Sequence, residues 1–211
     1  MEIRVGSAPD VALQRLQSFL GALLNRDAHL RAWVAHLRSA DQLARLRSGD
    51  LELGLIHHGH VESDIATAAV FRGERMVAVL PIGHRLAAAD AIGPEDFERE
   101  TLLVAPRDAD PALHDRVVSL HGHRFQTVHE TIGTDVRDLL LAVGDGFGIA
   151  LGPASMLASI GELSRVVTTS LLEPPSYLPE TLLAWSTDPV VRPPDRLIDS
   201  ACAAVRDLRR P

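Results

Sequence analysis

Two stretches of this sequence share one pattern, and that pattern decides the fold. Residues 39–56 read SADQLARLRSGDLELGLI, and residues 134–153 read TDVRDLLLAVGDGFGIALGP. Each stretch opens with a hydroxyl residue suited to an N-cap, continues as a short amphipathic helix, stops at a glycine and enters a short apolar strand. A capped helix that points its free N–H groups out of a sheet can bind an anion. One such site in each of two lobes predicts a small ligand held in a cleft between them.

The apolar periodicity around these stretches predicts two sets of elements in β-α-β-α-β order, the signature of a parallel sheet with crossover helices. The first set has strands at 3–6, 30–36 and 51–56 and helices at 11–25 and 40–48. The second set has strands at 102–105, 127–131 and 148–151 and helices at 111–120 and 135–143. Further strands are expected at 65–71, 75–80, 166–170 and 181–185, and further helical segments at 93–97, 154–158 and 193–208.

The two sets predict an α/β fold of two Rossmann-like lobes joined by two crossover strands. The chain is expected to leave the first lobe near 75–80 and to return near 181–186. Lobe I then contains residues 1–74 and 182–211, and lobe II contains residues 75–181. Since open α/β sheets bind ligands at the carboxyl ends of their strands, the residues at those ends are the candidates for ligand contact.

The composition excludes several classes of protein. The net charge is −7 and all 21 basic residues are arginines; they are scattered along the chain, so tight binding to nucleic acid is not expected. No apolar run is long enough to span a bilayer, so no membrane partner is expected. The chain begins directly with a strand pattern rather than an export signal, and Cys202 is its single cysteine. Both features predict a cytoplasmic location.

Four short strings have a recognisable order and spacing: residues 3–6, 43–56, 77–81 with 83–86, and 144–153. Together they resemble the effector-binding domain of the LysR-type transcriptional regulators, which has the periplasmic-binding-protein type 2 fold. The resemblance covers nearly the whole chain. It implies a ligand sensor that needs no cofactor and forms an antiparallel homodimer. It also implies that DNA is bound only through an N-terminal winged helix-turn-helix, which this sequence lacks.

The strand ends and the resemblance together give the candidate ligand-binding residues. The hydroxyls of Ser7 and Ser39 are expected to face the ligand. Arg107 is the expected partner of a ligand carboxylate, because its planar guanidinium binds two oxygens. Asp108 beside it either neutralises Arg107 or binds a ligand amine or hydroxyl. The full set is Ser7, Ala8, Pro9, Ser39, His57, His58, Pro106, Arg107, Asp108, Thr131, Gly133, Thr134, Gly152 and Pro153.

Simpler interpretations compete with some of these assignments. Ser7 suits a cap of the first helix as well as a ligand contact. His57, His58 and His60 suggest a metal, but adjacent histidines on a strand point to opposite faces, and no cysteine or carboxylate stands at a zinc-like spacing. The sequence contains neither a Gly-x-Ser-x-Gly nucleophile elbow nor a phosphate loop. We therefore expect neither a metal nor catalysis.

Three functions share the predicted fold. The first is a regulatory sensor of a small, anionic effector that modulates transcription. The second is the solute-binding protein of a transporter, which the missing export signal disfavours. The third is an enzyme such as a prephenate dehydratase, for which no catalytic Thr-Arg-Phe-type string is present.

Two helices carry more apolar residues than one covered face needs, which predicts an interface. In the helix at 11–25 these are Val11, Leu13, Leu16, Phe19, Leu20, Leu23 and Leu24, and in the helix at 135–143 they are Leu139, Leu140 and Leu141. The alternative is deeper burial of both helices within their own lobes.

Overall fold

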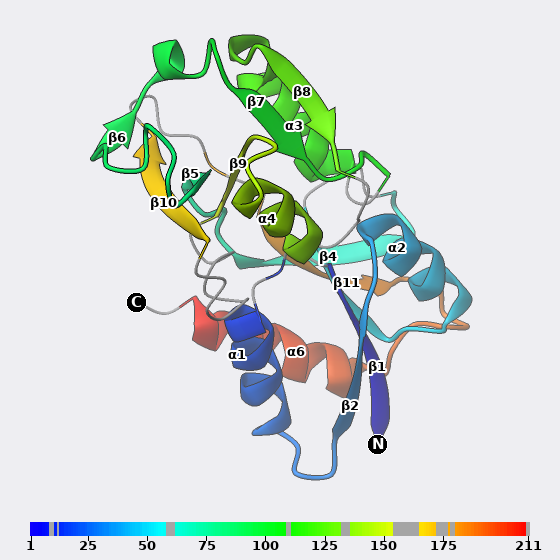
Figure 1. The fold of residues 1–211 in the computed structure, drawn as a ribbon. Helices are drawn as coiled ribbons and strands as arrows, with labels where there is room; N and C mark the ends of the chain where they lie inside the picture. Colours follow the sequence, from blue (N-terminus) through cyan, green and yellow to red (C-terminus); the bar gives the residue numbers. More distant parts are fainter. Residues whose placement is uncertain are drawn as a thin grey trace. The chain divides into compact units, whose positions relative to one another are not determined.

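The computed structural model describes residues 1–8, 11, 13–57, 62–108, 111–131, 136–153, 165–171, 177 and 180–209. The chain divides into two compact units, each with its own sheet (Figure 1). The first unit contains Met1–Arg72 and Glu180–Pro211, and the second contains Gly73–Pro179. Over the described ranges, no helix combines the length and the apolar character needed to cross a bilayer.

The first unit contains a five-stranded sheet in the order β2-β1-β3-β11-β4. Its strands are β1 (Glu2–Ser7), β2 (Arg31–His36), β3 (Leu53–His57), β4 (Ile65–Phe71) and β11 (Thr181–Ser186). β1 pairs in parallel with β2 and β3, whereas β11 runs antiparallel between β3 and β4. The carboxyl ends of β1, β2 and β3 therefore lie along one edge of the sheet.

Helices cover both faces of this sheet (Figure 1). α1 (Leu13–Leu24) and α6 (Asp195–Leu208) pack on one face, and α2 (Ser39–Ser48) packs on the other. Successive side chains of β3 point to opposite faces of the sheet, so β3 contributes to the core under α1 and α6 and to the core under α2. Leu53 and Leu55 join the core that contains Phe19 of α1, while Ile56 joins the core that contains Leu46 of α2.

The second unit contains a six-stranded sheet in the order β6-β10-β5-β9-β7-β8. β8, β7 and β9 are parallel, and β5 runs antiparallel between β9 and β10. α3 packs on one face and α4 on the other, because alternate residues of β7 reach cores that contain Val117 of α3 or Leu140 of α4. The elements are β5 (Met76–Pro81), β6 (Ala91–Ile92), η1 (Pro94–Asp96), β7 (Thr101–Val104), α3 (Pro111–His121), η2 (Gly122–Arg124), β8 (Thr127–Glu130), α4 (Val136–Gly144), β9 (Ile149–Pro153) and β10 (Val166–Leu171).

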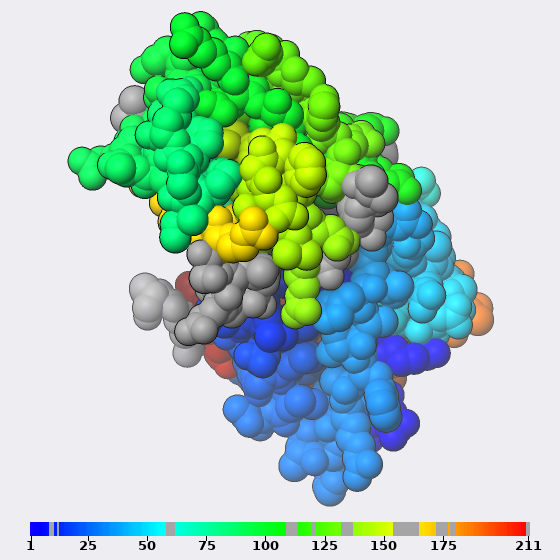
Figure 2. Space-filling view, viewed as in Figure 1, coloured from blue at the N-terminus to red at the C-terminus, as the bar shows by residue number. Residues whose placement is uncertain are grey.

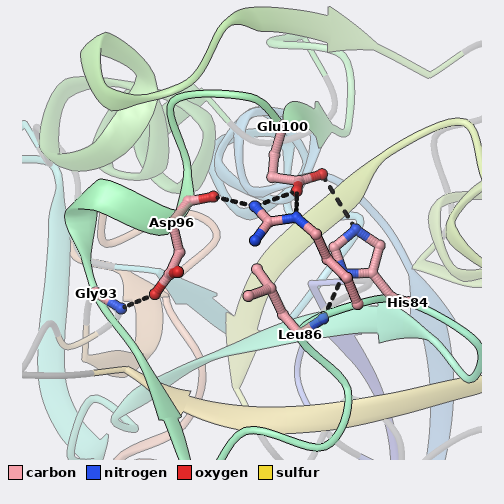
Figure 3. Close-up of polar contacts among 6 residues, drawn as sticks. His84, Leu86, Gly93, Asp96 and Glu100 are labelled. Atoms are coloured by element: carbon pink, nitrogen blue, oxygen red, sulfur yellow. Dashed lines mark hydrogen bonds and ion pairs between the residues drawn. The ribbon is translucent and has the colours of Figure 1, made fainter.

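Polar contacts hold residues 84–86 of the string 83–86, which begins two residues after the end of β5 (Figure 3). Nε and Nη2 of Arg85 donate to Oε1 of Glu100 at 3.0 and 2.8 Å. Nδ1 of His84 accepts the N–H of Leu86 at 3.3 Å, so Nε2 carries the ring proton and donates to Oε2 of Glu100 at 3.1 Å. Because Glu100 immediately precedes β7, this string fixes the loop after β5 to the start of β7, which is a structural role.

The predicted helices and strands that fall on described residues are confirmed, with ends that move by at most two residues. β3 begins at Leu53 rather than Leu51, because the N–H of Leu51 closes the end of α2 by donating to the carbonyl of Arg45 at 3.1 Å. β6 and η2 were not predicted, since two or three residues show no periodicity. The helix expected at 154–158 lies outside the described residues.

Most of the apolar residues expected at an interface belong to the cores instead. Leu13 of α1 and Leu141 of α4 remain 47% and 48% exposed. For the buried residues the alternative of burial within each lobe is correct, because both helices are packed against their sheets along most of their length. The buried residues are Val11, Leu16, Phe19 and Leu23 in the first unit and Leu139 and Leu140 in the second.

Candidate functional site

In the first unit, three candidate residues lie at the carboxyl edge of the sheet. Ser7 is the last residue of β1, Ala8 follows it, and His57 is the last residue of β3. All three are buried within the unit. The ladder continues beyond β1, because the N–H of Ala8 donates to the carbonyl of Leu55 at 3.0 Å. Ser7 and His57 thus end their strands instead of following them in loops.

The alternative that Ser7 caps the first helix is wrong, because α1 begins only at Leu13. The hydroxyl of Ser7 lies 3.4 Å from the carbonyl oxygen of Ala8, which is a long contact for an O–H donor. The carbonyl of Ser7 accepts the N–H of Leu37 at 3.0 Å. The backbone of Ser7 is therefore fixed, while its hydroxyl has only a weak local partner among the contacts described.

The predicted N-cap role of Ser39 is also wrong. The N-cap of α2 is Arg38, whose backbone is extended at φ −56° and ψ 148° and whose carbonyl accepts the N–H of Gln42 at 3.0 Å. The guanidinium of Arg38 pairs with Asp41, one turn into the helix, at 2.8 Å. Ser39 is thus the first helical residue. It stays half-buried in the first turn, where the helix dipole favours a negatively charged ligand.

In the second unit, the candidate residues also gather at one sheet edge. Pro106, Arg107 and Asp108 follow β7, and Thr131 follows β8. The N–H of Thr131 donates to the carbonyl of Val104 at 2.9 Å, which holds the end of β8 beside the end of β7. β9 is parallel to β7, so its buried last residues reach the same edge; these are Gly152 and Pro153.

Arg107 is paired with Asp115 of α3. Nε and Nη2 of Arg107 donate to Oδ1 and Oδ2 of Asp115 at 2.7 and 2.6 Å. Asp115 presents both oxygens to the planar guanidinium, so this carboxylate partner of Arg107 comes from α3, and the role of Asp108 stays a prediction. His114 extends the group, with Nδ1 at 3.3 Å from Asp115 and Nε2 at 3.2 Å from Glu130. A carboxylate ligand at Arg107 must therefore compete with Asp115.

The hydrogen bonds from Arg107 and then from His114 lower the pKa of Asp115 from 3.8 to about 2. Because folding lowers the pKa of Asp115, its ionised carboxylate stabilises the fold fully above pH 3.8. This stabilisation is lost as the pH falls through about 2. We expect carbon NMR of the Asp115 carboxyl group to show an ionised group below pH 3.8 in the folded chain. Arg107→Ala should move the midpoint back toward 3.8, and a wild-type midpoint already at that value would contradict the pairing.

The other predicted site residues are outside the described part of the chain: Pro9, His58, Gly133 and Thr134. The histidine run is described only as far as His57. Within the described ranges, no group of three or more histidine, cysteine, aspartate or glutamate side chains is arranged to hold a metal ion.

Sequence reasoning missed three residues at these edges. Asp115 and His114 are on a helix that follows the candidate loop, and only the fold shows that they reach back to Arg107 and Glu130. Gln42 is fully buried beneath the first-unit edge. Glutamines on helices and glycines in strands are common, so only the fold shows that Gly6 and Gly54 lie against this amide.

Comparisons with known proteins agree with this architecture. The family model described as "LysR substrate binding domain" matches residues 1–204. The reduced form of the OxyR regulatory domain from Pseudomonas aeruginosa superposes with a TM-score of 0.80 at 17% identity, covering 97% of this chain and 96% of that one. The BenM effector binding domain with its effector benzoate superposes with a TM-score of 0.78 at 19% identity, covering 98% of this chain and 91% of that one. At such identities the structures show a shared fold. No curated protein matches the chain.

Proposed function

The chain belongs to the LysR substrate-binding domain family, and we propose that it senses a small anionic effector at the carboxyl ends of its parallel strands. The predicted family and the type 2 periplasmic-binding-protein fold are confirmed, and the chain is an effector-binding domain of the LysR regulatory type. The effector's charge, the residues that contact it and a cleft between the two lobes are parts of the proposal. So is the action of the domain in the cytoplasm as a regulator of transcription.

One observation supports an anionic effector above the others. In the first unit, only Leu37 and Arg38 separate the end of β2 from the start of α2, so the first turn of α2 lies at the edge that also carries Ser7 and Ala8. The first N–H groups of a helix lack partners inside the helix and attract negative charge. The relative BenM, whose effector is benzoate, provides an example of a carboxylate effector on the same fold.

The test is a calorimetric titration with small mono- and dicarboxylates, beginning with benzoate. Each acid is paired with its neutral amide, which has a similar shape but no charge. We expect at least one carboxylate to bind and its amide to bind much more weakly, because charge-assisted hydrogen bonds are about twice as strong as neutral ones. Tighter binding of the amides would contradict an anionic effector.

A solute-binding protein and an enzyme remain less supported alternatives. The family match is to the LysR substrate binding domain, and the similar solved structures are described as a regulatory domain and an effector binding domain. The proposal of a regulator is therefore preferred to both.

We also propose that the chain forms an antiparallel homodimer. β2 is an edge strand of the first sheet, and its Trp33 is 66% exposed. Figure 2 shows the blue segments that include β2 on the visible surface of the first unit. Together with Leu13 of α1 and Leu141 of α4, Trp33 gives apolar surface that the monomer leaves uncovered.

Sedimentation of the chain at micromolar concentration should show a dimer. Trp33→Asp should raise the dimer dissociation constant by about tenfold or more, because exposed tryptophans at interfaces are frequent hot spots. Val190→Asp is the matched control, since Val190 is an 89% exposed apolar residue in the loop before α6. A wild-type monomer, or equal effects of the two changes, would contradict this interface.

A further inference from the structure

Gln42 is a fully buried polar side chain of the first unit, and it lies between α2 and the sheet. Its Nε2 group donates to the carbonyl of Leu37 at 2.8 Å and to the carbonyl of Leu55 at 3.2 Å. Leu37 directly follows β2 and stands two residues before Ser39, and Leu55 stands in β3 two residues before His57. The amide therefore joins the segment between β2 and α2 to β3, close in sequence to two candidate ligand residues, Ser39 and His57.

The same two backbone positions also hold the end of β1. The carbonyl of Leu55 accepts the N–H of Ala8 at 3.0 Å, and the N–H of Leu37 donates to the carbonyl of Ser7 at 3.0 Å. With the two bonds from Gln42, these contacts connect the ends of β1, β2 and β3 in one network. Leu37, two residues before Ser39, is joined to Ser7 in this network, although Ser39 and Ser7 are 32 positions apart in the sequence.

Two glycines make room for the amide. Gly6 of β1 and Gly54 of β3 are paired across the parallel ladder. A Cβ atom on Gly6 would lie 2.6 Å from Oε1 of Gln42, and one on Gly54 would lie 2.8 Å from it. Any larger residue at either position would displace the amide. The close approach of the Gln42 amide thus explains why β3 has a glycine at position 54.

The buried amide of Gln42 has an unfavourable atom as well as two favourable contacts. Its Oε1 atom is buried and has no hydrogen-bond partner among the residues that the structure describes. Burying an unpaired oxygen is unfavourable, and an apolar side chain of similar size would avoid that cost. What the amide supplies is its pair of N–H donors, both of which are used on backbone carbonyls at the strand ends.

We propose that Gln42 is the positioning residue of the effector site in the first unit. Its amide fixes the segment 37–39 against the ends of β1 and β3, and so sets the place of Ser39 relative to Ser7. Gln42 itself acts through the backbone and makes no ligand contact. The part of this inference that concerns the effector rests on the proposed function, while the part that concerns the segment 37–39 does not.

The test uses Gln42→Met, which keeps the length of the side chain and removes both donors. Its matched control is Leu46→Met, one turn further along the same face of α2 and equally buried. Amide hydrogen exchange of the full chain, followed by NMR, needs no ligand. We expect the amides of Leu37 and Ala8, which donate to the carbonyls of Ser7 and Leu55, to exchange about tenfold faster or more in Gln42→Met, since losing one net hydrogen bond has an effect of this order. Leu46→Met should leave these two amides unchanged.

A second measurement separates positioning from simple packing. The carboxylate that the wild-type chain binds most tightly in the calorimetric panel is titrated into both variants, and their melting temperatures are compared. Gln42→Met should lose about tenfold or more in affinity, while Leu46→Met, with a comparable loss of stability, should keep wild-type affinity. Unchanged exchange at Leu37 in Gln42→Met would overturn the proposal, and so would faster exchange with unchanged affinity. If the wild-type chain binds none of the carboxylates, the proposed function fails, and the exchange experiment alone decides the role of Gln42 in holding the segment 37–39.

Discussion

Phe19→Ala is expected to lower the free energy of unfolding by about 3–5 kcal/mol, the usual cost of removing a fully buried aromatic side chain. Phe19 is on α1 and packs in the core with strand residues such as Leu53 and Leu55. The truncation leaves a cavity between the helix and the sheet that the surrounding side chains fill only in part. Urea unfolding, monitored by far-UV circular dichroism, measures the effect.

Leu13→Ala is the matched control for Phe19→Ala. Leu13 is on the same helix but is 47% exposed in the monomer. In the monomeric range of concentration we expect this change to stay within about 0.5 kcal/mol of wild type. Equal effects of the two substitutions would mean that α1 is not packed as described, and a small effect of Phe19→Ala would restore its interpretation as an interface residue.

Arg107→Ala is expected to weaken the binding of a carboxylate effector by about 1.5–3 kcal/mol, the range for hydrogen bonds to charged groups. Arg107 stands at the carboxyl edge of the second sheet and offers two donors in one plane. Calorimetry with the tightest-binding carboxylate of the panel measures the loss. An unchanged affinity would remove Arg107 from the site.

Two further variants sharpen this prediction. Asp115→Asn removes the carboxylate that competes for Arg107, and it should strengthen effector binding by no more than about 1 kcal/mol, because exposed ion pairs are weak. Arg165→Ala is the control, since Arg165 is as exposed as Arg107, at 61% against 60%, and pairs with Asp145. Both residues of that pair precede their strands, so they lie at the opposite edge of the sheet. Arg165→Ala should leave effector affinity unchanged.

The order of elements could be predicted from the sequence because it depends on local signals. Period-two and period-3.6 patterns mark strands and helices wherever an element has one or two buried faces. β6 has only two residues and gives no such signal. The start of β3 depended on a backbone hydrogen bond between Leu51 and Arg45, which hydrophobicity does not report.

The details of the candidate site could be predicted only in part, because they depend on contacts between distant residues. The sequence indicated that Arg107 is a cation at a strand end, but its partner Asp115 comes from the following helix. It suggested a cap for Ser39, whereas the chain places Arg38 at that position. Apolar content alone could not divide the residues of α1 between core and interface, since burial depends on how the helix is rotated against its sheet. Gln42 showed its role only when Gly6 and Gly54 were seen beneath it.

The central claim is that one small anionic effector contacts the carboxyl ends of the parallel strands of both units. NMR of the isotopically labelled chain, titrated with the same panel of carboxylates and their neutral amides, tests this claim most directly. We predict saturable shifts of the backbone amides of Ala8, Ser39, Arg107 and Thr131 with at least one carboxylate, and much weaker shifts with its amide. Saturable shifts confined to the opposite edge of the second sheet, around Asp145 and Arg165, or no saturable shift with any carboxylate, would contradict the account.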